Sequence, residues 1–328
     1  MELALRPMST SQVLDRTFYI YRNHFVLLAG IGALLPAMLL VMQLAFIPLG
    51  FPPRATSKTA PEAIPEATVI LLLGYFCCYG VIYLIGTALA GGATVFGVSK
   101  LHLGQDVTIG EAYKQVFSRF WRIVGVIVLI GMIVFGALFV GEVIAIIVIA
   151  FSAGSASIFA RGSTGLAGIG VVLAIIWAIA IFLAAIAAAL FFYSKLALAI
   201  PACILEQLPV WVALRRSWYL TKGSVLRIML VNLLTWVLSV VLGLALTVPG
   251  QILAATLPNK ALLLGLVLQH IGGFIAGVLA GPIATTAIAL IYYDQRVRKE
   301  AFDLQHMMEA MGQQAATQAA TAAPPAFG

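Results

Sequence analysis

The sequence predicts an all-α, polytopic membrane fold: a helical bundle of six transmembrane helices with three short amphipathic helices at the membrane surface. Three observations lead to this prediction: the composition, six long apolar segments, and a bias of basic residues to one side of those segments. Of the 328 residues, 62% are hydrophobic and 9% are charged, whereas a soluble domain carries about 25% charged residues. Such a chain cannot cover its surface with polar groups in water, so a lipid bilayer must be its solvent.

Six segments are long enough to cross a membrane, because a spanning helix needs about 20 apolar residues. Several are longer, which predicts helices that tilt or extend beyond the bilayer. Between the segments, residues 48–65 are rich in proline, residues 152–165 are rich in serine and glycine, and residues 257–260 contain a Pro-Asn turn, so loops are expected there. The predicted spans are Phe25–Ile47, Val69–Val98, Ile123–Phe151, Leu166–Tyr193, Ile228–Pro249 and Leu262–Tyr293.

Basic residues are distributed unevenly between the two ends of these spans. With the N-terminus on the cytoplasmic side, fifteen of the nineteen Lys and Arg residues fall on that side. Cytoplasmic loops of membrane proteins carry such an excess, so both termini are predicted to be cytoplasmic. The same bias explains the net charge of +7 without a nucleic-acid partner. The four basic residues on the opposite side are Arg54, Lys58, Arg161 and Lys260.

A basic, aromatic stretch recurs before pairs of spans. Residues 14–22 read LDRTFYIYR, residues 214–222 read LRRSWYLTK, and a weaker copy covers residues 112–122. The copies predict three units of one surface helix and two spans, at about residues 8–105, 106–206 and 207–311, related by a pseudo-threefold axis. The alternative is that any hairpin entering from the cytoplasm begins with basic and aromatic residues. Residues 312–328 form a low-complexity tail, which is predicted to be disordered.

The first copy has the pattern of a helix that lies in the membrane interface. Leu14, Phe18, Tyr21 and Phe25 are spaced by four, three and four residues, which places them on one helical face, while the charged residues lie elsewhere. At headgroup depth a Lys or Arg contributes about 1 kcal/mol to binding of anionic lipid. The alternative is that these residues only determine topology. The candidate lipid-binding residues are Arg16, Arg22, Arg215, Arg216 and Trp218.

Ionisable residues within or beside the spans are further candidates for function. Glu206 could cap the helix of Arg215 and Arg216 or form an ion pair with it. At the end of the last span, Asp294 and Arg298 are four residues apart and can pair along a helix. The candidate intramembrane polar or ion-pair residues are Glu142, Lys195, Glu206 and His270.

Small residues recur along the last span at Gly273, Gly277 and Gly281. A small residue at every fourth position lets two helices approach closely. This stripe predicts either a homo-oligomer interface or helix packing within the bundle. Pro282, next to the stripe, can kink the helix.

No group of residues suggests catalysis or a cofactor. The chain has no phosphate-binding loop, no nucleophile elbow and no paired carboxylates with a partner base. Its three cysteines have neither the number nor the spacing of a disulfide framework or metal site. The sequence therefore predicts no catalytic residue, no metal and no cofactor. The four histidines lie in four different segments, at His24, His102, His270 and His306.

Three stretches resemble the membrane domain that is attached to some bacterial glycerophosphoryl diester phosphodiesterases and is also present as stand-alone proteins. They are residues 5–25, with LRP and LDRTF; residues 201–218, with Pro201, Glu206 and ALRRSW; and residues 292–304, YYDQRVRKEAFDL. The resemblance implies a bacterial cytoplasmic membrane protein. It implies no phosphodiesterase activity, because the fused enzymes hydrolyse their substrates with a separate (β/α)₈ barrel. Such a barrel takes about 250 residues, for which this chain has no room.

The expected function is that of a non-catalytic membrane module that binds lipids or a partner, either another membrane protein or a second copy of the chain. One alternative is a transporter of small solutes or lipids, with a midplane cavity lined by groups such as Glu142, Asn232, Gln269 and His270. Another is a membrane enzyme, which would bring ionisable residues together at one membrane depth.

Overall fold

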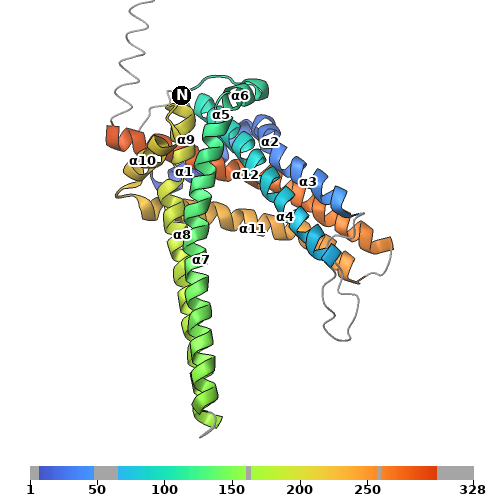
Figure 1. Cartoon of the computed structure of the whole chain (residues 1–328). Helices are drawn as coiled ribbons and strands as arrows, with labels where there is room; N and C mark the ends of the chain where they lie inside the picture. The colour runs from blue at the N-terminus through green and yellow to red at the C-terminus, as the bar shows by residue number, and fades with distance from the viewer. Residues whose placement is uncertain (1–6, 48–65, 160–163, 257–259, 301–328) are drawn as a thin grey trace, which may run out of the picture.

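The computed structural model describes residues 7–47, 66–159, 164–256 and 260–300. In these ranges the chain is helical and has no β-strand, which confirms the predicted all-α fold (Figure 1). The predicted proline-rich loop, most of the Pro-Asn turn and the predicted tail at residues 312–328 lie outside the described ranges. The helices are α1 (Thr10–Asn23), α2 (Phe25–Gly32), α3 (Leu34–Phe46), α4 (Glu66–Gly86), a π-helix (Thr87–Gly91), α5 (Gly92–His102), α6 (Ile109–Phe117), α7 (Phe120–Phe159), α8 (Thr164–Leu196), α9 (Ala199–Leu205), α10 (Val210–Thr221), α11 (Val225–Thr256) and α12 (Lys260–Glu300).

Five helical segments in the described ranges are long and apolar enough to cross a membrane, and there are six spans if the bent pair α2–α3 forms one of them. This pair occupies the first predicted span, Phe25–Ile47, which is therefore not one straight helix. Its two helices are bent by 43°. Pro36, in the first turn of α3, has no N–H to donate to the carbonyl of Gly32, so the helical hydrogen-bond ladder is interrupted there.

The loop predicted at residues 152–165 is wrong for most of its length. α7 continues to Phe159 and α8 begins at Thr164, so the two helices are 40 and 33 residues long. Serine and glycine indicate loops in water, but glycine is more frequent in transmembrane helices than in soluble ones. The composition of this stretch was therefore no evidence against a helix.

A short helix precedes each pair of long segments: α1, α6 and α10 take these places in the chain order. α1 begins with a capping box between Ser9 and Gln12. The N-cap of α6 is Thr108, whose hydroxyl accepts a hydrogen bond from the N–H of Glu111 at 3.3 Å. The element order agrees with three units of one short helix and two spans. The pseudo-threefold relation and the surface position of the short helices stay predictions.

α1 packs against the protein with residues other than those of its predicted apolar face, and the position of that face in the membrane interface stays a prediction. Phe18 of the predicted face is 47% exposed, and Phe25 of the same face is the first residue of the next helix, α2. The hydroxyl of Tyr21 donates to the carbonyl of Leu279 at 3.0 Å and so ties α1 to α12. The residues that α1 does bury are Val13, Thr17 and Ile20.

The buried core lies at one end of the long helices. The basic residues gather at the same end, which we call the basic end. There the short helices pack around the starts of α7 and α11 and the ends of α8 and α12 (Figure 1). Farther from the core, α7 and α8 run as one arm, and α11 and α12 run with α3 and α4 as another. Apolar side chains on the arms, such as Phe139 and Ile147, are exposed, as expected where lipid tails are the solvent. The largest fully buried side chains include Leu28, Ile123, Leu198, Leu220, Ile228 and Tyr292.

The close approach of α11 and α12 depends on glycines outside the predicted stripe. A Cβ atom on Gly272 would lie 2.1 Å from the carbonyl oxygen of Leu246. A Cβ on Gly250 would lie 2.4 Å from the backbone nitrogen of Gln269. These backbones are too close for any side chain, so the two helices require glycine at these positions. For Gly272 the sequence does carry a signal, because this residue lies seven positions after another glycine, Gly265.

The predicted glycine stripe contributes less to helix packing. A Cβ on Gly277 would meet the ring of Pro36 at 2.7 Å, so this glycine packs within the bundle, against α3. A Cβ on Gly273 would reach Thr247 at 3.8 Å, an ordinary contact. A Cβ on Gly281 would have no described atom within 4 Å. Only Gly277 of the three therefore has a close neighbour among the residues that the structure describes.

Candidate functional site

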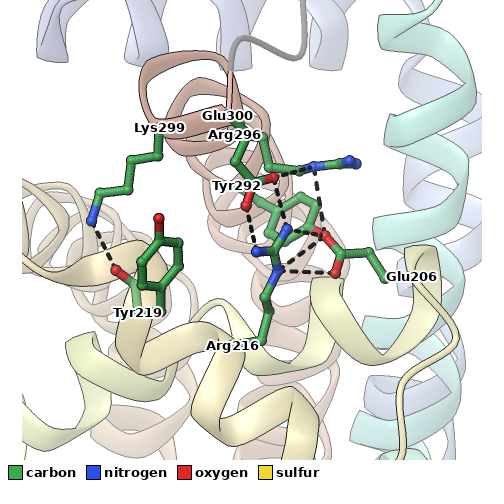
Figure 2. A network of polar contacts seen from close by, with 7 residues as sticks. All are labelled: Glu206, Arg216, Tyr219, Tyr292, Arg296, Lys299 and Glu300. Atoms are coloured by element: carbon green, nitrogen blue, oxygen red, sulfur yellow. Dashed lines mark hydrogen bonds and ion pairs between the residues drawn. The ribbon is translucent and has the colours of Figure 1, made fainter. Parts of the chain in front are cut away.

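A network of carboxylates and guanidinium groups joins three helices at the basic end (Figure 2). Arg216 of α10 lies between Glu206, which directly follows α9, and Glu300, the last residue of α12. Its Nε and Nη2 atoms each donate to an oxygen of Glu206 at 2.9 Å. Its Nη2 also donates to Oε2 of Glu300 at 2.7 Å. Because the guanidinium meets both carboxylates through paired hydrogen bonds, it fixes α10 against the end of α12.

Tyr292 and Arg296 of α12 complete this network. The Tyr292 hydroxyl donates to Oε1 of Glu206 at 2.5 Å, and the Nε atom of Arg296 lies 3.5 Å from the same oxygen. Burial raises the pKa of Glu206, but the hydrogen bonds from Arg216 and Tyr292 and the charges of Arg216 and Arg296 outweigh burial, so this pKa lies below the usual value. An ionised carboxylate surrounded by guanidinium groups is a structural clamp and a poor proton carrier.

We expect the Glu206→Gln variant to be less stable than the parent protein by about 1.5–3 kcal/mol at pH 7, the range for hydrogen bonds to charged groups. The difference should shrink as the pH falls below about 4.5, the ordinary pKa of this carboxyl. Below that value the unfolded chain binds the proton first, so the stabilisation by ionised Glu206 is lost as the pH passes through its lowered folded-state pKa. Thermal unfolding in detergent between pH 3.5 and 7.5 measures both effects.

The control for this experiment is Glu142→Gln, which removes an exposed carboxylate on α7. Its stability should differ from that of the parent by less than about 0.5 kcal/mol at pH 7. A constant difference between Glu206→Gln and the parent over the whole pH range would contradict the pairing of Glu206 with Arg216.

A second cluster surrounds Asp294, whose side chain is fully buried. Its Oδ2 atom lies 2.7 Å from Nη1 of Arg227 and 2.9 Å from Nε of Arg298, so the pair predicted between Asp294 and Arg298 is present. Its Oδ1 atom accepts from the N–H of Met8 at 2.7 Å, and both arginines donate to the Met8 carbonyl. One carboxylate thus joins the N-terminal segment, the start of α11 and the end of α12.

Beside these clusters lies a hollow of about 720 Å³, which we call the basic pocket, at the turn between α10 and α11. Gly223 makes the turn with a φ of +85°, in the left-handed region that favours glycine. Four basic side chains line the pocket, and none of its described lining residues is acidic. Its walls are Lys222, Gly223, Ser224, Val225, Leu226, Arg227, Gln295, Arg298 and Lys299.

The candidate lipid-binding residues on α10 differ in their availability. Arg216 is bound to two carboxylates and is not available to a ligand. Arg215 is exposed. Trp218 is 46% exposed, and the ammonium group of Lys195 lies 4.9 Å from its ring centre. Trp218 and Lys195, predicted as separate candidates, therefore meet in the structure.

The two candidates on α1 lie apart from the basic pocket's lining. Arg22 is exposed in the last turn of the helix. The guanidinium of Arg16 lies 5.0 Å from the ring centre of Tyr19, one turn along the same helix. Their role in lipid binding stays a prediction.

In the described ranges, the polar residues considered for transport do not share the walls of the cavity between the two helix pairs α7–α8 and α11–α12. Asn232 lines a cavity of about 420 Å³ between α7–α8 and α11–α12, but Glu142, Gln269 and His270 are not in its walls. Glu142 is exposed, and His270 is half-buried in α12. In the described ranges, no cluster of His, Cys, Asp or Glu could hold a metal ion.

Sequence reasoning missed the basic pocket. Lys222 was predicted as a cytoplasmic charge and as the end of a repeat copy, and Arg227 had no predicted partner. Lys299 was predicted as a cytoplasmic charge that can pair with Asp303, which lies outside the described ranges. A basic residue before a Gly-Ser turn at a helix start could have drawn attention to Lys222. The pocket is formed by residues of the segments 222–227 and 295–299, which are about 70 positions apart in the sequence. Ser224 and Gln295, for example, form a hydrogen bond. No local sequence pattern predicts such a contact.

Residues 169–321 match the family model of the membrane domain of glycerophosphoryl diester phosphodiesterase. The predicted resemblance is thereby confirmed for this part of the chain, which contains two of the three stretches that carried it. The first stretch, at residues 5–25, lies outside the match. No curated protein and no solved structure matches the chain.

Proposed function

We propose that a chain with this membrane domain is a non-catalytic module that binds anionic phospholipids through the basic pocket. The charge of the pocket is the observation that carries the proposal. Its lining has four basic side chains, and in the described ranges the carboxylate paired with them is that of Asp294, shared by Arg227 and Arg298. Lys222 has no ion pair in the same ranges. The remaining positive charge attracts an anion.

The pocket suits a phosphate group in particular. The first N–H groups of a helix have no intrahelical acceptor and carry a partial positive charge, and the first turn of α11, at Val225 and Leu226, forms part of the wall. Phosphates bind at such helix starts. Arginine and lysine add charge-assisted hydrogen bonds to phosphate oxygens. We therefore place the phosphate between the start of α11 and the end of α12.

The surroundings favour a phosphate that belongs to a lipid. Leu226, in the pocket wall, is 76% exposed, and Trp211 and Tyr219 on α10 are 73% and 52% exposed. Exposed Trp and Tyr side chains are typical of the membrane–water interface. A phospholipid meets all of these groups at once, because its phosphate and its apolar chains lie at the corresponding depths.

The same proposal places the chain in a bacterial cytoplasmic membrane, with both termini in the cytoplasm. The bias of basic residues toward the basic end supports this orientation. The cytoplasmic leaflet is rich in anionic lipids, which attract basic segments near its surface. The basic pocket then faces the leaflet that holds its ligand.

Lipid titrations followed by native mass spectrometry test the proposal on the full chain in detergent, with phosphatidylglycerol and zwitterionic phosphatidylcholine as probes. We expect preferential binding of phosphatidylglycerol. We expect Lys222→Gln to weaken that binding about fivefold, since one basic residue near an anionic leaflet contributes about 1 kcal/mol. Lys222 is exposed, so the substitution should leave the fold intact.

Lys114→Gln is the matched control, because Lys114 is an exposed lysine on α6 outside the pocket wall. It changes the net charge by the same amount and should leave phosphatidylglycerol binding unchanged. Equal loss of binding in the two variants would show that binding depends on the basic surface as a whole and not on the pocket, which would overturn the proposal. Equal binding of the two lipids would do the same.

A further inference from the structure

Lys195 is a buried lysine whose ammonium group has aromatic neighbours and, among the described residues, no acidic one. It lies in the last turn of α8 and is 8% exposed. Its ammonium group lies 4.9 Å from the ring centre of Trp218 and 5.7 Å from that of Phe191. The Lys195 carbonyl accepts hydrogen bonds from Ser217 and Thr221, but in the part of the chain that the structure describes the ammonium group has no hydrogen bond and no ion pair. A buried charge is costly unless an opposite charge accompanies it.

The helix and the rings account for part of the stabilisation of this charge. A cation in the last turn of a helix interacts favourably with the helix dipole, and aromatic faces attract cations. Neither contact neutralises the charge, and neither satisfies the three N–H donors of the ammonium group. An anionic ligand would do both.

Lys195 adjoins the basic pocket through α10. Trp218 and Tyr219 are consecutive residues: Lys195 lies over the first ring, and Lys299 lies 5.2 Å from the centre of the second. Lys299 also donates to the carbonyl oxygen of Tyr219 at 2.8 Å (Figure 2) and to that of Lys222 at 2.7 Å. The three lysines thus form a continuous positive region around the end of α10.

We infer that the ligand of this region is a lipid with two phosphate groups, one in the basic pocket and one at Lys195. This inference rests on the proposed function and names its ligand class more closely. A single phosphate in the basic pocket leaves Lys195 without an anion. Two phosphates on one molecule occupy both sites with a single loss of translational freedom, so the second phosphate strengthens binding more than a separate lipid would.

The test compares diphosphatidylglycerol, which has two phosphates, with phosphatidylglycerol, which has one, by native mass spectrometry of the full chain in detergent. We expect the parent protein to bind diphosphatidylglycerol at least about fivefold more tightly, the factor that corresponds to one basic contact. Lys195→Met should remove most of that preference and leave phosphatidylglycerol binding unchanged. Lys195→Arg, which keeps the charge, should retain the preference.

Lys195→Met is expected to fold, because replacing a buried charge by an apolar side chain of similar size is often neutral or stabilising. Thermal unfolding of the variant checks this point. If the parent binds both lipids equally and Lys222→Gln still weakens binding, the two-phosphate inference is wrong and the proposed function stands. If the parent binds neither anionic lipid, both are wrong. An unchanged preference in Lys195→Met would overturn the inference alone.

Discussion

The Asp294→Ala variant should lose about 3–5 kcal/mol of stability, the usual cost of removing one partner from a buried ion pair. The Asp294 side chain is fully buried, and that of Arg227 is 19% exposed. The substitution leaves the guanidinium of Arg227 without its carboxylate in a place that water reaches poorly. It also removes the acceptor of the Met8 N–H, so the N-terminal segment should detach from α11 and α12. Unfolding by titration with sodium dodecyl sulfate in mixed micelles measures the loss.

The Lys100–Glu111 pair supplies the control for this prediction. Its charged atoms are 3.7 Å apart, and the two side chains are 32% and 47% exposed. Exposed pairs of this kind contribute little, so Glu111→Gln should change stability by less than about 0.5 kcal/mol. A similar loss in Asp294→Ala and Glu111→Gln would show that the Asp294 cluster does not hold the chain ends together.

Gly272→Ala should destabilise the protein by about 3 kcal/mol, at the upper end of the range for overpacking. The new Cβ atom would lie 2.1 Å from the Leu246 carbonyl oxygen and 2.8 Å from its carbon. These are backbone atoms of α11, so no rotation of a side chain can relieve the clash. The two helices must separate along their interface, which loses packing contacts over many residues. The same micelle titration measures the effect.

Gly281→Ala is the matched control, since it makes the same chemical change in the same helix. A Cβ at that position has no described neighbour within 4 Å, and alanine is favoured over glycine inside a helix by about 1 kcal/mol. We therefore expect Gly281→Ala to be neutral or stabilising, with the opposite sign to Gly272→Ala. If both variants are equally stable, α11 and α12 do not approach as closely as described.

The lipid experiments and these stability experiments address separate parts of the basic end. Asp294 and Arg216 hold helices together, and their substitution should lower stability. Lys222 is exposed, and Lys195 has no acidic partner in the ranges that the structure describes, so their substitution should alter ligand binding without loss of the fold. A variant that changes both properties would indicate that binding and folding depend on the same contacts.

Local features of the sequence were sufficient to predict the fold class. The hydrophobic composition and the length of the apolar segments indicate that a lipid bilayer surrounds the chain. Each span also lies within one continuous stretch of sequence, so a local pattern is enough to find it. The pair of Asp294 and Arg298 was predictable for the same reason, because residues four apart in a helix are neighbours. The bend in the first span could have been anticipated from Pro36, since its effect is also local.

The polar site depends on contacts between distant parts of the chain, which only the tertiary structure reveals. Arg216 and Glu300 are 84 positions apart, and Arg227 and Asp294 are 67 positions apart. No helical or strand period relates residues at such separations. Helix packing decides whether an arginine meets a carboxylate, as Arg216 does, or lies beside a pocket, as Lys222 does. It likewise makes Gly272 indispensable and leaves Gly281 without a close neighbour, because one faces the backbone of α11 and the other has no described atom within reach.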